Sequence, residues 1–185
     1  SIPRLRIGSL EPWDLPHDFF SLWENNRLCP HLHLPLQSGS DSVLKRMIRR
    51  CTVSEYMDLV AAARRQNPNF HISSDIIVGF PGETESEFTQ TVNAIEEIEF
   101  GVLHLFRYSP RQGTAASRMK NHVEKSIATT RYATLKAIGR RLKHKRLTSL
   151  IGQKRTILWE RDIERDESGH LIWSGYTEDY HRTSL

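Results

Sequence analysis

The stretch of sequence that decides the fold is residues 71–84, which read HISSDIIVGFPGET. Its centre, the apolar run IIV at residues 76–78, is typical of a parallel strand that is covered on both faces. The turn at residues 79–83, rich in glycine and proline, ends that strand. Thr84 and Glu87 then have the spacing of a capping box, in which two side chains satisfy free main-chain N–H groups at the start of a helix. The stretch therefore predicts a buried strand that a helix follows directly.

The same alternation of strand and helix runs through the first 110 residues. We expect strands at residues 5–7, 31–36, 71–78 and 102–106, and helices whose apolar faces carry residues 19–23, 43–48, 56–63 and 88–98. Thr52 and Glu55 form a second capping-box pattern. Strands that alternate with helices of this length form parallel sheets, so the fold class is α/β and fits part of a (β/α) barrel.

After residue 124 the pattern changes. One long helix is expected over residues 124–150, with a buried stripe of Tyr132, Leu135, Ile138, Leu142 and Leu150. Beyond Gly152 the apolar runs at residues 156–160 and 171–173 indicate β-strands. We expect two domains, 1–150 and 151–185, and the second is too short to be a complete barrel.

The composition excludes several classes of protein. The 185 residues are 38% hydrophobic and 26% charged, and no apolar stretch is long enough to cross a bilayer. With two cysteines, Cys29 and Cys51, the chain cannot hold a four-thiolate zinc ion or a three-cysteine cluster, and we expect a reducing, cytoplasmic location. His31 and His33 share one strand face, but a packing role is favoured over a metal pair. The chain begins without Met and reads as one entered in the middle.

The charge is unevenly distributed. The net charge is +4, yet residues 124–155 contain ten Lys or Arg and one acid, whereas the remainder carries an excess of acids. A basic stripe on an acidic body points to a polyanion such as nucleic acid, with a solvated helix face as the alternative.

Polar and turn residues gather where the expected strands end, namely at 11–12, 37–39, 79–83 and 108–111. Ligands of parallel α/β sheets bind at the carboxyl ends of the strands. The turn at 79–83 lacks the Lys-Ser/Thr of a phosphate-binding loop and the glycine spacing of a dinucleotide fingerprint. We therefore expect a binding site at this rim, but of neither of those kinds.

Three motifs resemble those of the radical S-adenosylmethionine (SAM) methylthiotransferases. They are residues 31–41 (HLHLPLQSGSD) with 43–49 (VLKRMIR) following, residues 74–84 (SDIIVGFPGET), and residues 106–116 (FRYSPRQGTAA). The resemblance is greatest to the type that acts on threonylcarbamoyladenosine in tRNA. It implies strands three to six of a radical SAM partial barrel, followed by the start of a TRAM-like RNA-binding β domain.

The sequence departs from that family at the iron–sulfur ligands. The family holds one 4Fe-4S cluster on a C-x3-C-x2-C loop and a second on cysteines of an N-terminal domain, and Cys29 and Cys51 match neither set. We expect the clusters, and a flavodoxin- or ferredoxin-like electron donor, to belong to a full-length parent that is a monomer. No metal ligand is assigned in this chain, and residues 1–185 alone are predicted to be inactive.

The resemblance also implies a SAM site. Arg49 is the candidate for the SAM carboxylate, because a guanidinium can bind it bidentately; the alternative is a surface arginine at a helix end. Gln37 is assigned to the ribose or the amino-acid end, and Asp75 to the same polar groups unless it is only a structural acceptor. Ile77 would pack on adenine and the main chain at Phe106 would bond its edge. Ser38 and Gly79, in the adjoining turns, complete the set.

Contacts to RNA are assigned to two places. Tyr108 and Arg111 lie at the rim, where they could receive an extruded base and its phosphate, unless they only fix the turn. The basic helix contributes the remaining candidates, Arg140, Arg141, Lys143, Lys145 and Arg146.

The leading functional hypothesis is a tRNA methylthiotransferase that adds a methylthio group to C2 of N6-threonylcarbamoyladenosine next to the anticodon by radical SAM chemistry. The Glu11-Pro12 pair and the motif at residues 108–116 favour this substrate. The alternatives are a methylthiotransferase for isopentenyladenosine in tRNA or for a ribosomal protein aspartate, and a non-catalytic RNA-binding module.

Overall fold

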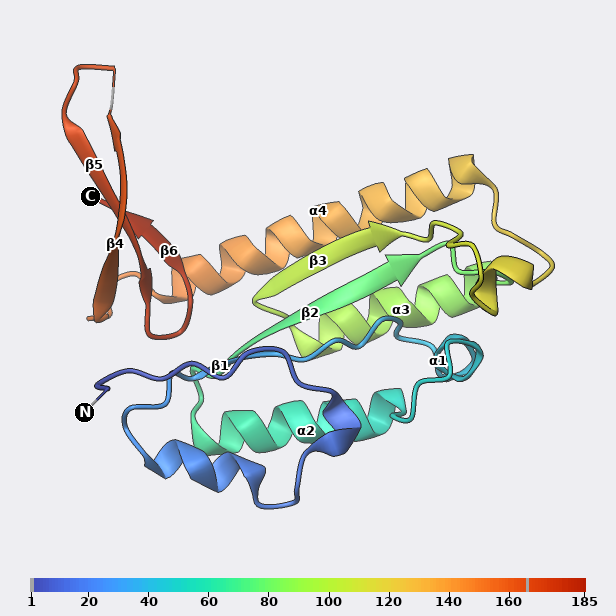
Figure 1. The fold of residues 1–185 in the computed structure, drawn as a ribbon, viewed down its shortest axis with the longest axis horizontal. Coiled ribbons are helices and arrows are strands. Elements are labelled where there is room, and N and C mark those ends of the chain that lie inside the picture. The colour runs from blue at the N-terminus through green and yellow to red at the C-terminus, as the bar shows by residue number, and fades with distance from the viewer. Residues whose placement is uncertain (1, 166) are drawn as a thin grey trace.

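The computed structural model describes residues 2–165 and 167–185, and its centre is a three-stranded parallel sheet (Figure 1). The strands β1 (His31–His33), β2 (His71–Val78) and β3 (Val102–Arg107) lie in the order β1-β2-β3. In this register Asp75 lies beside His104 and Ile77 beside Phe106. The α/β class with parallel strands is confirmed.

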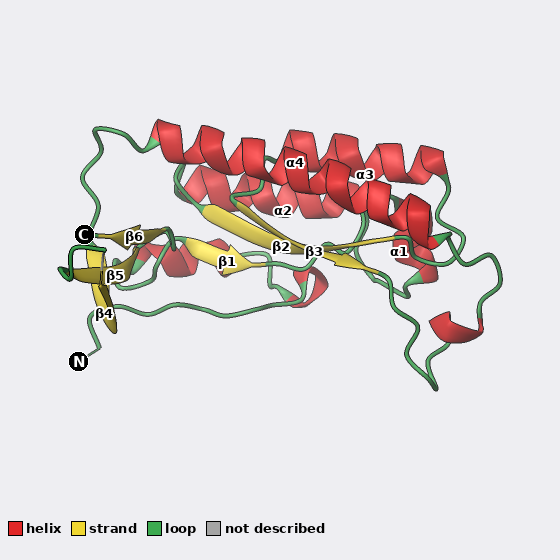
Figure 2. Cartoon of the chain, turned by 90° about the horizontal axis from the view of Figure 1, so that it is seen from above, coloured by secondary structure: helices red, strands yellow, loops and turns green. Residues whose placement is uncertain are grey.

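The helices cover one face of this sheet. They are α1 (Asp41–Arg46), α2 (Val53–Gln66), α3 (Glu85–Ile98) and α4 (Lys125–Ser149), and three short 3-10 helices are η1 (Pro12–Asp14), η2 (Phe19–Glu24) and η3 (Ala116–Arg118). Figure 2 shows α2, α3 and α4 together on the same side of β1, β2 and β3. Both capping boxes are present at the starts of α2 and α3, as the sequence predicts.

The core lies between the helices and the sheet. Ile72, Ile76 and Val78 of β2 are almost fully buried there, together with Leu135 and Leu142 of α4. The alternate side chains of β2 and β3 point to the other face, where Asp75 and Ile77 are half-buried and Phe106 is 50% exposed. The expectation that β2 is covered on both faces therefore holds in full for the helix-facing side only, and the more open face is the one that carries Asp75 and Ile77.

The C-terminal residues form a second, antiparallel sheet at the amino ends of the parallel strands (Figure 1). Its strands β4 (Ile157–Arg165), β5 (Leu171–Thr177) and β6 (Arg182–Ser184) lie in the order β4-β5-β6. Nδ1 of His71 donates a 2.5 Å hydrogen bond to the main-chain oxygen of Asp179, and Nη2 of Arg146 lies 3.3 Å from the Asp179 carboxylate. These contacts join the two sheets.

Two expected strands differ in the structure: one is absent and the other is shorter. Residues 5–7 form no strand, because Leu5 makes only a single bridge, to Leu28. The nearby Ser9 likewise makes only a single bridge, to His33. Strand β1 ends at His33 rather than at residue 36, since Pro35 has no N–H to donate to the ladder. The chain still follows β2 as far as Gln37, whose N–H donates to the oxygen of Asp75 at 2.8 Å.

Among the described residues no helix is both long enough and apolar enough to cross a bilayer.

Candidate functional site

A cavity of about 620 Å³ lies at the carboxyl ends of the parallel strands. Three segments that are far apart in the sequence supply its inner wall, through Gln37, Ile77 and Phe106. The rest of the lining comes from Arg46, Met47, Ile48, Arg49, Phe80, Arg107, Tyr108, Ser109, Arg111, Thr114, Ala115, Ala116 and Met119. A cavity of this size and mixed polarity suits a nucleoside-sized ligand.

Gln37 is held in an unusual backbone conformation. Its φ angle is 73°, in the left-handed region that non-glycine residues seldom adopt. Its N–H donates to Asp75 O at 2.8 Å, and its own oxygen accepts from Ile77 N at 2.9 Å. Two hydrogen bonds to β2 thus fix the strained residue, and strain of this kind gathers at functional sites.

The turn that ends α1 places the next residues, Met47, Ile48 and Arg49, on the cavity wall. The N–H of Ile48 donates to Lys45 O at 3.0 Å and that of Arg49 to Leu44 O at 2.9 Å, which is the pattern of a Schellman motif. Glycine usually occupies the left-handed position of this motif, but here it is Ile48, with φ 59° and 79% of its surface exposed. The expectation of a helix through Ile48 is therefore wrong by two residues, because α1 ends at Arg46.

Arg49 already binds a carboxylate. Its Nη2 donates to Glu11 Oε2 at 2.6 Å and to Pro35 O at 3.0 Å, and its Nη1 lies 3.4 Å from Glu11 Oε1. The guanidinium also stacks on Trp13, 4.3 Å from the ring centroid. The side chain of Arg49 is only 17% exposed, whereas that of Glu11 is 42% exposed. The carboxylate is thus the more exposed member of the pair, and the guanidinium is the one held by several contacts.

Aromatic residues form the opposite wall. Phe106 is half exposed, and Phe80 packs edge-on against Tyr108 with ring centroids 5.3 Å apart. The N–H of Tyr108 donates to Val78 O at 2.9 Å, which continues the β3 ladder. The phenolic oxygen of Tyr108 is buried and has no hydrogen-bond partner in the described protein. A buried hydroxyl without a partner is costly, so a ligand that bonds it would recover that cost.

A buried ion pair supports this wall from behind. Nη1 of Arg131 on α4 donates to Glu83 Oε2 at 2.7 Å, and the same oxygen accepts from Gly79 N at 2.8 Å. Burial raises the pKa of Glu83, while its bonds to Gly79 and Arg131 act in the opposite direction. Sequence reasoning counted Arg131 with the exposed basic stripe; it is in fact 5% exposed.

Three predicted SAM residues do not reach the cavity. Ser38 is fully buried beneath α3, where its hydroxyl lies 3.3 Å from Thr91 Oγ1. Asp75 lies deeper on the same open sheet face, 3.4 Å from His33 Nε2. Gly79 faces α4, and a Cβ on it would approach the Cβ of Ala128 to 2.8 Å. Gln37, Arg49, Ile77 and Phe106 are brought together; these three are not.

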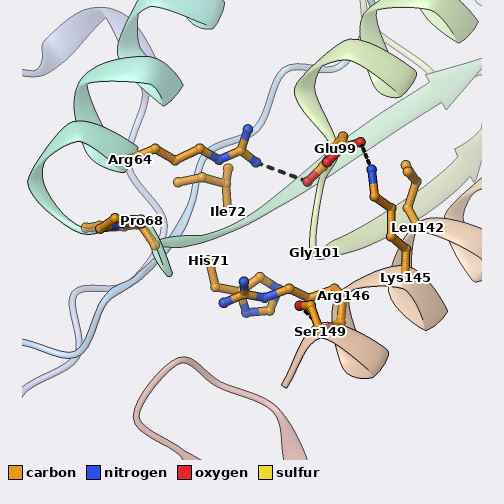
Figure 3. Close-up of a pocket in the computed structure, with 11 residues that line it drawn as sticks. Arg64, Pro68, His71, Ile72, Glu99, Gly101, Leu142, Lys145, Arg146 and Ser149 are labelled. Carbon is orange, nitrogen blue, oxygen red and sulfur yellow. Dashed lines mark hydrogen bonds and ion pairs between the residues drawn. The ribbon is translucent and has the colours of Figure 1, made fainter. Parts of the chain in front are cut away.

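The residues predicted to contact RNA also lie in different places. Tyr108 and Arg111 line the cavity. On α4, Arg141 pairs with Glu96 and Lys145 with Glu99, and Arg146 donates to Asn69 O at 2.9 Å. Figure 3 shows Lys145 pointing at Glu99 in a different pocket, with Arg146 next to His71. Arg140 and Lys143 are exposed and have no ion pair within the described ranges.

Comparisons with known proteins agree with this geometry. The model of the radical SAM superfamily matches residues 7–95. The threonylcarbamoyladenosine tRNA methylthiotransferase MtaB of Thermotoga maritima is 40% identical over 178 residues, which is 96% of this chain and 40% of that protein. MtaB of Bacillus subtilis is 35% identical over 97% of the chain, and the tRNA-2-methylthio-N(6)-dimethylallyladenosine synthase of Bartonella bacilliformis is 38% identical over 87%. The chain belongs to the radical SAM methylthiotransferase family.

This chain spans about 40% of the length of its MtaB relatives and 35% of the dimethylallyladenosine synthase. Coproporphyrinogen III oxidase (HemN) of Escherichia coli, a radical SAM enzyme, has a similar fold. The TM-score is 0.59 at 14% identity, over 95% of this chain and 46% of the oxidase.

The two cysteines of this chain do not fit an iron–sulfur cluster. Cys29 is buried and Cys51 is half-buried, and burial raises the pKa of the Cys51 thiol to about 11. A cluster ligand must be a thiolate. Within residues 2–165 and 167–185 no three His, Cys, Asp or Glu side chains gather as a metal site requires.

Proposed function

We propose that this chain supplies the SAM-binding and RNA-facing part of a tRNA methylthiotransferase. The observation that carries the proposal is the convergence of Gln37, Arg49 and Ile77 on one cavity at the carboxyl ends of the strands. In α/β sheets of this kind that edge is where ligands bind.

The residues present fit SAM. Arg49 offers a fork that already holds a carboxylate, and Gln37 offers both a donor and an acceptor for a hydroxyl or an amino group. Ile77 and Phe106 present apolar surface that suits the adenine ring. When bound and reduced, SAM supplies the carbon-centred radical that this enzyme family uses to activate a C–H bond.

Glu11 would compete with the ligand for Arg49. The carboxylates of Glu11 and of SAM would pair with the same guanidinium, so SAM binding exchanges one ion pair for another. The surroundings of Arg49 favour this exchange, because Trp13 and Pro35 O hold the guanidinium in place while Glu11 leaves. The role of Glu11 in the free chain is to keep a half-buried cation paired.

For the substrate we propose the adenosine that carries a threonylcarbamoyl group, next to the anticodon. Two relatives of that activity, at 40% and 35% identity, support it, and the motif at residues 108–116 favours it. The second candidate is the isopentenyl (dimethylallyl) adenosine of tRNA, since a synthase for that nucleoside is 38% identical. A ribosomal protein aspartate is disfavoured by the basic excess of residues 124–155, and the cavity at the strand ends disfavours a non-catalytic RNA-binding module.

The remaining assignments belong to the same proposal. Residues 1–150 form part of a radical SAM partial barrel, corresponding to strands three to six and the basic helix, and residues 151–185 are the start of a TRAM-like domain. Because Cys29 and Cys51 do not fit a cluster, residues 1–185 alone do not start the radical reaction. The complete enzyme works in the cytoplasm as a monomer, with 4Fe-4S clusters held elsewhere and a flavodoxin- or ferredoxin-like electron donor.

Analysis of the modified nucleosides in tRNA tests the proposed substrate. We expect mass spectrometry of tRNA from a strain that lacks the gene to show loss of the methylthio form of threonylcarbamoyladenosine, with the parent nucleoside accumulating. Restoring the intact gene should restore the methylthio form, and a copy with Arg49→Ala should not. Loss of methylthio-dimethylallyladenosine instead selects the second candidate. An unchanged profile contradicts both.

A further inference from the structure

Helix α4 carries two kinds of basic residue. The first kind is paired with acidic residues of the body: Arg131 with Glu83, Arg141 with Glu96, Lys145 with Glu99, and Arg146 with Asp179. The second kind is Lys125, Lys136, Arg140 and Lys143, which are exposed and have no ion pair in the part of the chain that the structure describes; all but Lys125, at the start of the helix, lie close together. The high charge of the helix is thus concentrated on one unpaired row.

This row lies on one face of the helix. Spacings of four and three residues place Lys136, Arg140 and Lys143 on the same side of α4, over about 10 Å of its length. A groove of about 260 Å³ separates the row from β3. Its lining comprises Val102, Leu103, Leu105, Tyr132 and Gly139, besides the three cations.

The groove follows the free edge of β3. In the described sheet β3 pairs only with β2, so its outer main-chain groups have no strand partner. At one end the groove reaches Leu105, and the next residues of that strand, Phe106 and Arg107, line the SAM cavity. Arg107 also donates to Thr129 of α4 at 3.1 Å, which keeps helix and strand together at this end.

At its other end the groove meets an aromatic hollow. Lys143 and Val102 also line a second space of about 250 Å³, together with Tyr176, Tyr180 and Arg182. The rings of Tyr176 and Tyr180 are stacked, with centroids 4.6 Å apart and planes 19° from parallel. Tyr180 is 41% exposed and Tyr176 is half-buried, and the guanidinium of Arg6 lies over the other face of the Tyr180 ring, 4.2 Å from its centroid. A basic groove next to a partly exposed aromatic pair is the combination that binds single-stranded nucleic acid, through phosphates and base stacking.

We propose that the groove between α4 and β3 binds a single-stranded RNA segment and leads it to the SAM cavity. Lys136, Arg140 and Lys143 pair with successive phosphates, and a base takes the place of the Arg6 guanidinium on the Tyr180 ring. An extended acidic peptide added to the edge of β3 is the other possible occupant, but it would not use the tyrosine stack. The proposal rests on the proposed function, because the RNA it names is the strand that carries the target adenosine.

Two charge-matched double variants of the full chain test the groove. Lys136→Ala/Lys143→Ala removes two unpaired cations, and Arg141→Ala/Lys145→Ala removes two paired cations from the same helix. The probe is a fluorescent anticodon stem-loop RNA, with its dissociation constant measured by anisotropy at several salt concentrations. We expect the first variant to bind at least tenfold more weakly and its salt slope to fall by about 1.4, which corresponds to two lost contacts to single-stranded phosphates. The second variant should stay within about twofold of the unaltered chain.

Equal losses of RNA affinity in the two variants would contradict the proposal that the groove binds RNA, because they would mean that only the net charge of the helix matters. The proposal also fails if the unaltered chain does not bind the RNA. It fails as well if a polyglutamate peptide, and not the RNA, binds in the groove. None of these results alters the nucleoside profile of the deletion strain, so the groove and the proposed function fail separately. Circular dichroism of both variants checks that α4 is intact.

Discussion

At the scale of single residues, Ile48 is the clearest sign that the end of α1 serves a ligand. A left-handed C′ position is normally glycine, because a β-carbon there is strained. In this chain the position carries a β-branched side chain that is 79% exposed on the cavity wall. We infer that apolar contact with a ligand offsets such strain.

This residue gives a test in which stability and binding change in opposite directions. We expect Ile48→Gly to raise the free energy of unfolding by about 1 kcal/mol, since the strain is relieved, and to weaken SAM binding. Ile48→Ala is the matched control: it removes the same apolar contact but keeps the β-carbon, so binding should fall without any gain in stability. Urea unfolding and calorimetric titration with SAM measure the two quantities. A loss of stability in Ile48→Gly would contradict this account of the turn.

Arg49 gives a second test at this scale. Arg49→Ala should weaken SAM binding by about 1.5–3 kcal/mol, which is the range for hydrogen bonds to a charged group. Glu11→Gln removes the competing carboxylate and should strengthen binding, whereas a purely structural Glu11–Arg49 pair predicts no such gain. Titration of both variants with SAM measures the effects. Unchanged affinity in Arg49→Ala removes this residue from the site.

At the scale of elements, the sequence predicts those features that depend on neighbours along the chain. The capping boxes at Thr52 and Thr84, strand β2 and the limits of α4 agree with the structure because local hydrogen bonds and periodicity determine them. The segment at residues 5–7 does not agree, since a strand needs a partner along its length and this one finds only single bridges. Periodicity also gives no information on which acid a basic residue meets, so Arg131 looked like a surface charge.

The tie between Arg131 and Glu83 holds α4 to the loop that carries Phe80. Arg131→Met would leave the Glu83 carboxyl buried without its cation, and we expect a loss of about 3–5 kcal/mol in the free energy of unfolding. Arg131→Met/Glu83→Gln removes both charges and should recover most of that loss. Urea denaturation compares the variants. If the double variant is no more stable than the single one, the pair acts through something other than its charge.

At the scale of the whole molecule, three strand ends meet at one edge because the strands are parallel. This is why Gln37, Ile77 and Phe106, which the family resemblance assigned to one site, lie together on the cavity wall. Ser38 and Gly79 could not be excluded in advance, since the conformation of each turn decides which way it faces. Asp75 shares the open face with Ile77, but it lies one layer deeper and pairs with His33.

The junction of the two sheets makes stability depend on pH. Burial lowers the pKa of His31 to about 3 and that of His71 to about 4, from an ordinary value of 6.5. The unfolded chain therefore binds more protons than the folded one below pH 6.5, so stability is full above that pH and is lost as the pH falls towards 4. We expect the free energy of unfolding to fall by up to about 1.4 kcal/mol per pH unit for each of these histidines.

Measurement between pH 6.5 and 5 separates this effect from that of Glu87, whose pKa lies at about 2 and whose stabilising shift is lost only below its ordinary value of 4.5. Urea midpoints at several pH values give the slope. His71→Asn preserves a donor for Asp179 O and should flatten the curve. A stability independent of pH in this window would mean that the histidines are not buried neutral in solution.

The central claim is that the strand ends converge on a SAM site, and mapping of amide NMR shifts during titration of the chain with SAM tests it most directly. The account predicts shift changes concentrated at Gln37, Ile77, Phe106 and Arg49, with little change at Glu99 or at the antiparallel sheet. Changes centred on the pocket around Glu99, or no change at the strand ends at saturating SAM, would contradict it.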